Sequence, residues 1–154
     1  MTRLAAILLG VLSLVLAACG GSDAPSREEF ADQASEICRD AERSLENVGE
    51  NAETPDEIAD AVDRVIEESR GAVDDLAELE RPEGEAGETA ERFVNATRRE
   101  IEDEGIPALE DLRDALASDD QQAAGEAAQR LQGIETDESN KAAEELGADA
   151  CTED

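Results

Sequence analysis

Thr54-Pro55-Asp56-Glu57 begins the clearest helical stretch of the sequence. The Thr54 hydroxyl can cap the exposed amides of a first turn, Pro55 has no amide to leave unpaired there, and Glu57 can reach back to the cap. Arg81-Pro82 is expected to end the stretch, because a residue before proline avoids helical backbone angles. Apolar residues at helical spacing lie between these signals, at Ile58, Val62, Val65, Ile66, Val73, Leu76 and Leu79. Together they predict one amphipathic helix over residues 55–81.

A second helix with the same kind of start precedes it. Ser26-Arg27-Glu28-Glu29 is another capping box, and Gly49 is expected to end that helix. Cys38 falls on its apolar face and is therefore expected to pack against the rest of the protein. The face consists of Phe30, Ala34, Ile37, Cys38, Ala41, Leu45 and Val48.

Two further stretches show helical periodicity. In the third, Pro107 cannot donate to the carbonyl of Asp103 and its ring crowds that carbonyl, so we expect a kink or a break. Asp119 with Gln122 is expected to open the fourth and Gly147 to end it, with a weak region over residues 136–140. The third face holds Ala90, Phe93, Val94, Thr97, Ile101, Leu109, Leu112 and Leu116. The fourth holds Ala123, Ala124, Ala127, Leu131, Ile134, Ala142 and Leu146.

The fold class follows from these four stretches. No run shows the period of two and the β-branched enrichment of a strand. Helices joined by short loops pack most simply as antiparallel neighbours. We therefore predict an all-α fold, an antiparallel up-down bundle of about four helices, with the third kinked or broken near Pro107.

The first residues predict export and a lipid anchor. Residues 1–3 carry one positive charge, residues 4–16 are apolar apart from Ser13, and small residues precede Cys19. This is the pattern of a secretory signal peptide, and the apolar run is too short for a membrane span. Leu16-Ala17-Ala18-Cys19 resembles a bacterial lipobox, whose cysteine carries diacylglycerol and becomes the new N-terminus. The alternative is a plain signal peptide with a chance cysteine.

This anchor divides the chain into three parts. Residues 1–18 form the signal peptide that is removed, residues 19–25 the lipidated cysteine and a flexible tether, and residues 26–154 the helical bundle domain. Two acyl chains suffice for stable anchoring, and the tether has a root-mean-square reach of about 13 Å. We expect the domain at the extracytoplasmic face of the cell membrane, close to its surface.

Composition limits the function. The chain has 42 Asp and Glu against 13 Lys and Arg, a net charge of −29, which excludes nucleic acid as a partner. Solubility or tolerance of high salt is the simplest explanation of the acids, and binding of a cation or a basic partner is the other. The chain has no histidine, which excludes Ser-His-Asp and Cys-His triads and the common histidine zinc and haem sites. We expect no enzymatic activity, no metal and no cofactor.

Cys38 and Cys151 remain once Cys19 is lipidated, an even pair in an oxidising compartment. We expect a disulfide between them, with two unpaired thiols as the alternative. Because Cys38 lies about 18 Å along its helix, the tail after Gly147 has to run back beside that helix for the bond to form.

Three segments carry a resemblance. They are Phe30-Ala31-Asp32-Gln33-Ala34-Ser35-Glu36-Ile37-Cys38, the helix end Leu76-Ala77-Glu78-Leu79-Glu80-Arg81-Pro82, and Ala142-Ala143-Glu144-Glu145-Leu146-Gly147 followed by Cys151. They resemble small lipoproteins of actinobacteria, the high-GC Gram-positive bacteria, over most of the chain after Cys19. The resemblance implies a lipid-anchored helical domain with one cysteine near each end, and it implies no activity and no functional residues.

Acidic stretches supply weaker candidates. Residues 100–105 have acids at alternate positions and a glycine in sixth place, with Asp111 in twelfth, as in a calcium loop. The early acids are Glu rather than Asp or Asn, and the stretch also fits the helical pattern, which we favour. We expect Asp74-Asp75 to be solvated surface. Two weak pairs between residues four apart are also expected, Arg98–Glu102 and Arg99–Asp103.

Two classes of function fit these observations. The first is a membrane-anchored lipoprotein whose acidic helical domain is a non-enzymatic interaction module for an envelope protein. The second is a low-affinity module at the membrane surface that binds a cation or a small ligand.

Overall fold

Both predicted capping boxes are present and start the first two helices. In the computed structural model, which describes residues 24–152, α1 (Arg27–Leu45) begins after Ser26. The Ser26 hydroxyl accepts from the Glu29 amide, and the Glu29 carboxylate accepts from the Ser26 amide. Thr54 and Glu57 make the same reciprocal bonds before α2 (Pro55–Glu78). Each box satisfies amides that a first turn leaves without partners.

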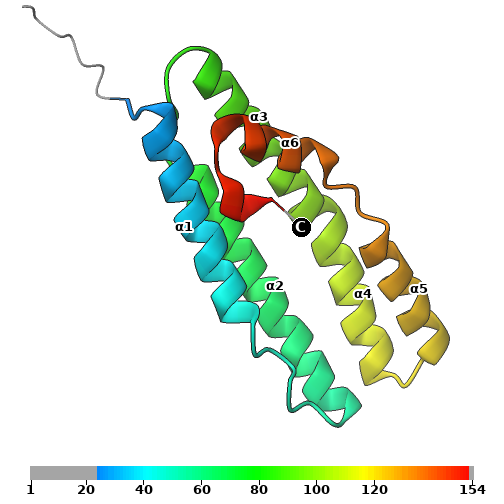
Figure 1. Ribbon diagram of the computed structural model, residues 1–154. Coiled ribbons are helices and arrows are strands. Elements are labelled where there is room, and N and C mark those ends of the chain that lie inside the picture. Colours follow the sequence, from blue (N-terminus) through cyan, green and yellow to red (C-terminus); the bar gives the residue numbers. More distant parts are fainter. Residues whose placement is uncertain (1–23, 153–154) are drawn as a thin grey trace, which may run out of the picture.

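The later helices build the rest of an antiparallel bundle. They are α3 (Glu85–Arg98), the π-helical segment η1 (Arg99–Gly105), α4 (Ile106–Ala117), α5 (Gln121–Gln132), α6 (Asp137–Leu146) and the short 3-10 helix η2 (Asp149–Cys151). Figure 1 shows α1 and α2 as a hairpin, α3 and α4 as one long rod beside it, and α5 and α6 returning along that rod. Residues 24–152 contain no strand, and the predicted all-α up-down bundle is confirmed.

The predicted irregularity near Pro107 takes the form of a widened helix. The Ile106 amide donates to the Ile101 carbonyl, five residues back, which is one residue further than in an α-helix. Pro107 is the second residue of α4 and directly follows the widened segment. The chain therefore passes from α3 into α4 without a loop (Figure 1).

The fourth predicted helix is divided into α5 and α6. The break covers residues 133–136, just ahead of the weak region expected over residues 136–140. The predicted opening at Asp119 is wrong by one residue, because the Asp120 carboxylate accepts from the Ala123 amide at 3.1 Å and caps α5. Asp119 instead turns the chain with a φ of 56°. Gly147 ends α6 in the left-handed conformation, as predicted.

Two groups of apolar side chains form the core. The larger lies where α1 begins and α6 ends, and its Phe30, Phe93 and Leu146 are at most 2% exposed. Burying each such side chain stabilises the fold by about 1.5–3 kcal/mol. Small residues let the helices approach closely around them, namely Ala31, Ala34, Ala90, Ala142, Ala143 and Ala148. The smaller group lies between α2 and α4 and contains Val62, Ile66 and Ile106.

The turn from α2 to α3 joins the larger core. Arg81 donates to the Leu76 carbonyl at 3.2 Å, near the end of α2, and lies 5.6 Å from the centre of the Phe30 ring. Gly87 approaches Pro82 so closely that a Cβ there would collide with the Pro82 carbonyl oxygen. This position requires glycine because the colliding atom belongs to the backbone.

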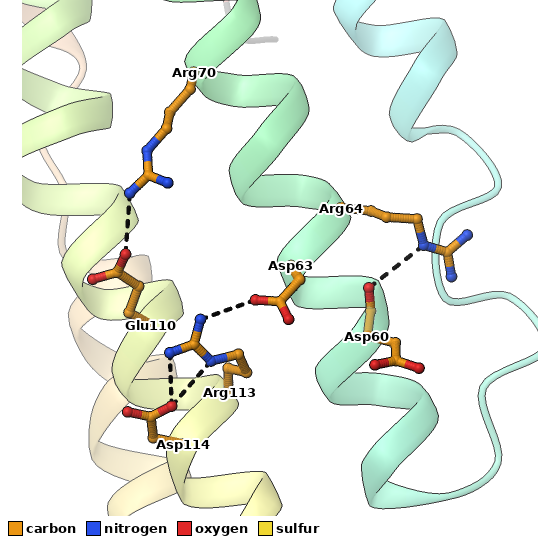
Figure 2. A network of polar contacts seen from close by, with 7 residues as sticks. All are labelled: Asp60, Asp63, Arg64, Arg70, Glu110, Arg113 and Asp114. Atoms are coloured by element: carbon orange, nitrogen blue, oxygen red, sulfur yellow. Dashed lines mark hydrogen bonds and ion pairs between the residues drawn. The ribbon is translucent and has the colours of Figure 1, made fainter.

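Arginine–carboxylate pairs cross several of the helix contacts. Figure 2 shows the pairs between α2 and α4, where Arg70 contacts Glu110 at 3.0 Å and Arg113 contacts both Asp63 and Asp114. The two carboxylates raise the pKa of Arg113. Three further pairs join α3 to α6, η1 to α6 and α4 to α5, namely Arg92–Glu145, Arg99–Glu138 and Arg130–Asp111. Exposed pairs contribute only about 0–1 kcal/mol each, but they neutralise acids along these contacts.

Candidate functional site

A groove of about 550 Å³ runs between α1 and α2. Its α1 wall extends over residues 33–44 and its α2 wall over residues 67–79. Because the two helices form an antiparallel hairpin (Figure 1), the start of one wall faces the end of the other. The groove thus begins in the second turn of α1 and continues almost to the end of that helix.

Acidic side chains occupy both rims of the groove, and all of them are exposed. Asp40 pairs with Arg43 on its own helix. Among residues 24–152, no basic side chain lines the groove, and the other four acids have no ion-pair partner. The five acids are Glu36, Asp40, Glu67, Glu68 and Asp75.

The floor of the groove is apolar. Ile37, Ala41, Ala72 and Leu79 are half-buried there, and the exposed Gly71 lies beside them. Glycine inside a helix is less stable than alanine by about 0.5–1 kcal/mol. A Cβ on Gly71 would meet no atom within 4 Å, so packing within the chain does not require glycine. Gly71 leaves the α2 backbone open to whatever enters the groove.

The electrostatics of this groove differ from those of the other helix contacts. A second groove, of about 620 Å³ between α4 and α5, has acidic walls as well, but Arg130 lies in it and pairs with Asp111. Among the described residues, no ion pair joins α1 to α2. Within the described part of the chain, four of the five acids along the α1–α2 groove are therefore left without a compensating charge, and only Asp40 has one.

The predicted disulfide fixes the helix that forms one wall. Cys38 and Cys151 are joined with an S–S distance of 2.08 Å and a Cα–Cα distance of 5.3 Å. As expected, the tail after Gly147 runs back beside α1, and η2 contacts that helix (Figure 1). The position of α1 is thus set by a covalent bond and apolar contacts, without an ion pair to α2.

Cys19, the predicted lipidation site, and the predicted signal peptide lie outside the described residues. Within residues 24–152, no helix combines the length and the apolar character that a membrane crossing requires.

The stretch compared with a calcium loop is helical throughout, in η1 and α4. Glu100 is only 6% exposed, and its Oε1 atom has no hydrogen-bond partner. Over the described part of the chain, no three Cys, Asp or Glu side chains gather in a way that could hold a metal ion. The helical interpretation of this stretch is confirmed.

One of the two predicted arginine pairs forms. Arg98 lies 3.8 Å from Glu102, as predicted. The prediction for Arg99 is wrong, because Arg99 pairs with Glu138 of α6 at 2.7 Å and not with Asp103. Arg99 is the first residue of η1, and its side chain reaches across to α6.

The groove itself was missed in the sequence, although a signal for it exists. Glu67, Gly71, Asp75 and Leu79 are each four residues apart and share one face of α2, and Asp75 belongs to the pair interpreted as solvated surface. Comparison of the chain with protein-family models, curated proteins and solved structures gives no match. The function is therefore inferred from the residues of this chain and their geometry.

Proposed function

We propose that the chain is a lipoprotein of the small actinobacterial kind, held by diacylated Cys19 at the extracytoplasmic face of the cell membrane. Its helical domain is a non-enzymatic interaction module for an envelope protein. The observation that carries this proposal is the α1–α2 groove, an open apolar floor between acidic rims on which, among the described residues, only Asp40 has a basic partner. A partner with positive charges that match these acids would associate faster and more specifically.

The chemistry of the groove favours recognition over catalysis. Carboxylates that act as acids or bases owe their reactivity to burial or to a closely placed partner. Glu36, Glu67, Glu68 and Asp75 are exposed and have no ion-pair partner among the described residues, and they are spread along two helices. Such an arrangement can attract and orient a cationic surface, but it does not converge on a reacting atom.

The position of the groove in the chain suits a partner at the membrane. The tether of residues 20–25 has a reach of about 13 Å, and α1 begins directly after it at Arg27. The groove wall starts at Gln33, which lies in the second turn of α1. A domain anchored at Cys19 therefore presents the groove near the bilayer surface, within reach of other envelope proteins.

The anchor is tested by expressing the full chain in a bacterial host that acylates lipoproteins. The mature protein should begin at Cys19 with the mass of a diacylglyceryl group, and Cys19→Ala should accumulate as the uncleaved precursor. Cys38→Ala is the matched control and should be processed normally, because Cys38 lies in the folded domain, where its sulfur is bonded to Cys151. Normal processing of Cys19→Ala contradicts the anchor.

The interaction is tested on intact cells with a photo-crosslinking residue placed on α1. Ser44 lines the groove, whereas Glu42 is exposed and does not line it. A cross-link to an envelope protein from position 44, and none from position 42, supports the proposal. Cross-links from neither position contradict an interaction module.

A further inference from the structure

We propose that the α1–α2 groove binds a basic amphipathic helix of a partner protein, with its apolar side on the floor and its Lys or Arg side chains on the acidic rims. This proposal rests on the interaction function proposed above and specifies the chemistry of the partner.

The dimensions of the groove suit a helix. Its α1 wall covers residues 33–44, about 17 Å of helix axis or three turns. The floor is low where Ala41, Gly71 and Ala72 lie, and, apart from its chain neighbours and the backbone of α2 itself, no atom comes within 4 Å of a Cβ built on Gly71. A second helix can therefore approach the α2 backbone closely at this point. Ile37 and Leu79 provide larger apolar contacts towards the other end.

The charges of the groove are arranged in rows that a helix can match. Glu36 and Asp40 are four residues apart on α1, and Glu67 and Asp75 are eight residues apart on one face of α2. Lys or Arg residues spaced three or four apart on a bound helix recur at the same rise along the axis. Their aliphatic stems would cover the floor while their charged ends reach the carboxylates.

The apolar floor favours a basic helix over simpler cations as the ligand of the groove. A linear polyamine carries charge without apolar side chains, so it leaves Ile37 and Leu79 exposed to water. A divalent ion needs several oxygen atoms around one point, whereas the groove carboxylates are distributed along two helices. An amphipathic basic helix is the class that uses both the floor and the rims.

The test uses the full-length protein in a non-ionic detergent and a synthetic helix of about 14 residues. This probe carries Leu or Ile along one face and Lys at every third or fourth position along both edges of that face. A scrambled peptide of equal composition, spermine and Ca²⁺ are the comparison ligands, and calorimetry measures all four. The probe should bind in a saturable way, at least about tenfold more tightly than the scrambled peptide. Its binding should weaken as salt rises, because exposed charges are screened beyond about 8 Å at physiological ionic strength.

Two pairs of variants locate the binding. Glu36→Gln with Asp75→Gln should weaken probe binding about fivefold, as expected for the loss of two exposed ion pairs. Glu42→Gln with Asp74→Gln removes the same charge outside the groove and should change it by less than about twofold. Gly71→Leu fills the groove and should weaken binding at least about tenfold. Gly125→Leu is its control, because it also meets open space but lies on the exposed side of α5.

The opposite results overturn the proposal. Equal binding of probe and scrambled peptide, or equal effects of Gly71→Leu and Gly125→Leu, would show only diffuse attraction of cations. Saturable Ca²⁺ or spermine binding that competes with the probe and is lost in the Glu36/Asp75 variant would assign the groove to a small cation. If the probe fails while the cross-link from Ser44 persists, the interaction module stands and the partner chemistry is wrong. If both fail, the interaction module is wrong as well.

Discussion

Removing the disulfide is expected to be the most destabilising change short of altering the core. Cys38 and Cys151 are separated by 113 positions. In the chain-entropy model, a cross-link over a loop of that length raises the free energy of unfolding by about 4.8 kcal/mol at 25 °C, and measured values are often lower. Both residues are half-buried, so replacement by alanine adds only a small packing loss. We expect a loss of about 3–5 kcal/mol for Cys38→Ala with Cys151→Ala.

The measurement is urea unfolding of the full-length chain, followed by circular dichroism, with and without reductant. Urea is preferred to guanidinium because a chain of net charge −29 is sensitive to ionic strength. Reduction of the wild-type protein should lower its stability to that of the double variant, and the variant itself should not respond to reductant. Hydrogen exchange should then quicken most in α1, because no ion pair holds that helix to α2 among the described residues. A shift below about 1 kcal/mol on reduction would refute the reasoning, since it would show that the tail and α1 stay together without the bond.

Three further changes probe particular positions, and each is measured by the same unfolding assay. Gly71→Ala should stabilise the protein by about 0.5–1 kcal/mol, whereas Gly87→Ala should destabilise it by more than that, because its new Cβ meets a backbone carbonyl; equal effects would contradict the geometry. Glu100→Met should stabilise by about 1–3 kcal/mol, because it removes a buried oxygen without a partner, and Glu104→Met at an exposed neighbour should not. Backbone hydrogen bonds from the cap of α2 lower the pKa of Glu57 below its ordinary value of 4.5. The ionised Glu57 side chain therefore contributes fully to the stability of the fold above pH 4.5, and this contribution is lost as the pH falls through the lowered pKa. The Glu57→Gln variant should therefore lose less stability on acidification than the wild type, and parallel pH curves would contradict this.

The sequence predicts the helices well where local signals act. The two capping boxes and the Gly147 cap of α6 depend on residues within one turn, and the disulfide follows from the count of cysteines. All of them are present in the structure. The errors arise where packing decides. The position of the break between α5 and α6 and the choice of Asp120 over Asp119 depend on how α5 returns along α4.

The candidate site was harder to predict because it depends on which faces of two helices meet. Glu36 and Asp75 each look like ordinary solvated acids in the sequence. Only the packing of α1 against α2 places them on opposite sides of the same groove. The partner of Arg99 shows the same effect, since Glu138 lies on α6 and is distant from Arg99 in sequence. The acidic composition indicated a cationic partner as one possibility, but it gave no location.

The widened turns of η1 also connect two parts of the domain, the α3–α6 end and the α4–α5 end, whose relative rotation they set. A π-helical segment holds one residue more than an α-helix of the same length, and one residue corresponds to about 100° of rotation. Deleting a single residue from 99–105 would thus rotate α4, with the α5 that follows it, relative to α2, while the contacts of α3 with α6 stay in register. The α4–α5 end could therefore be exchanged for another hairpin while the end that holds the larger core keeps its shape.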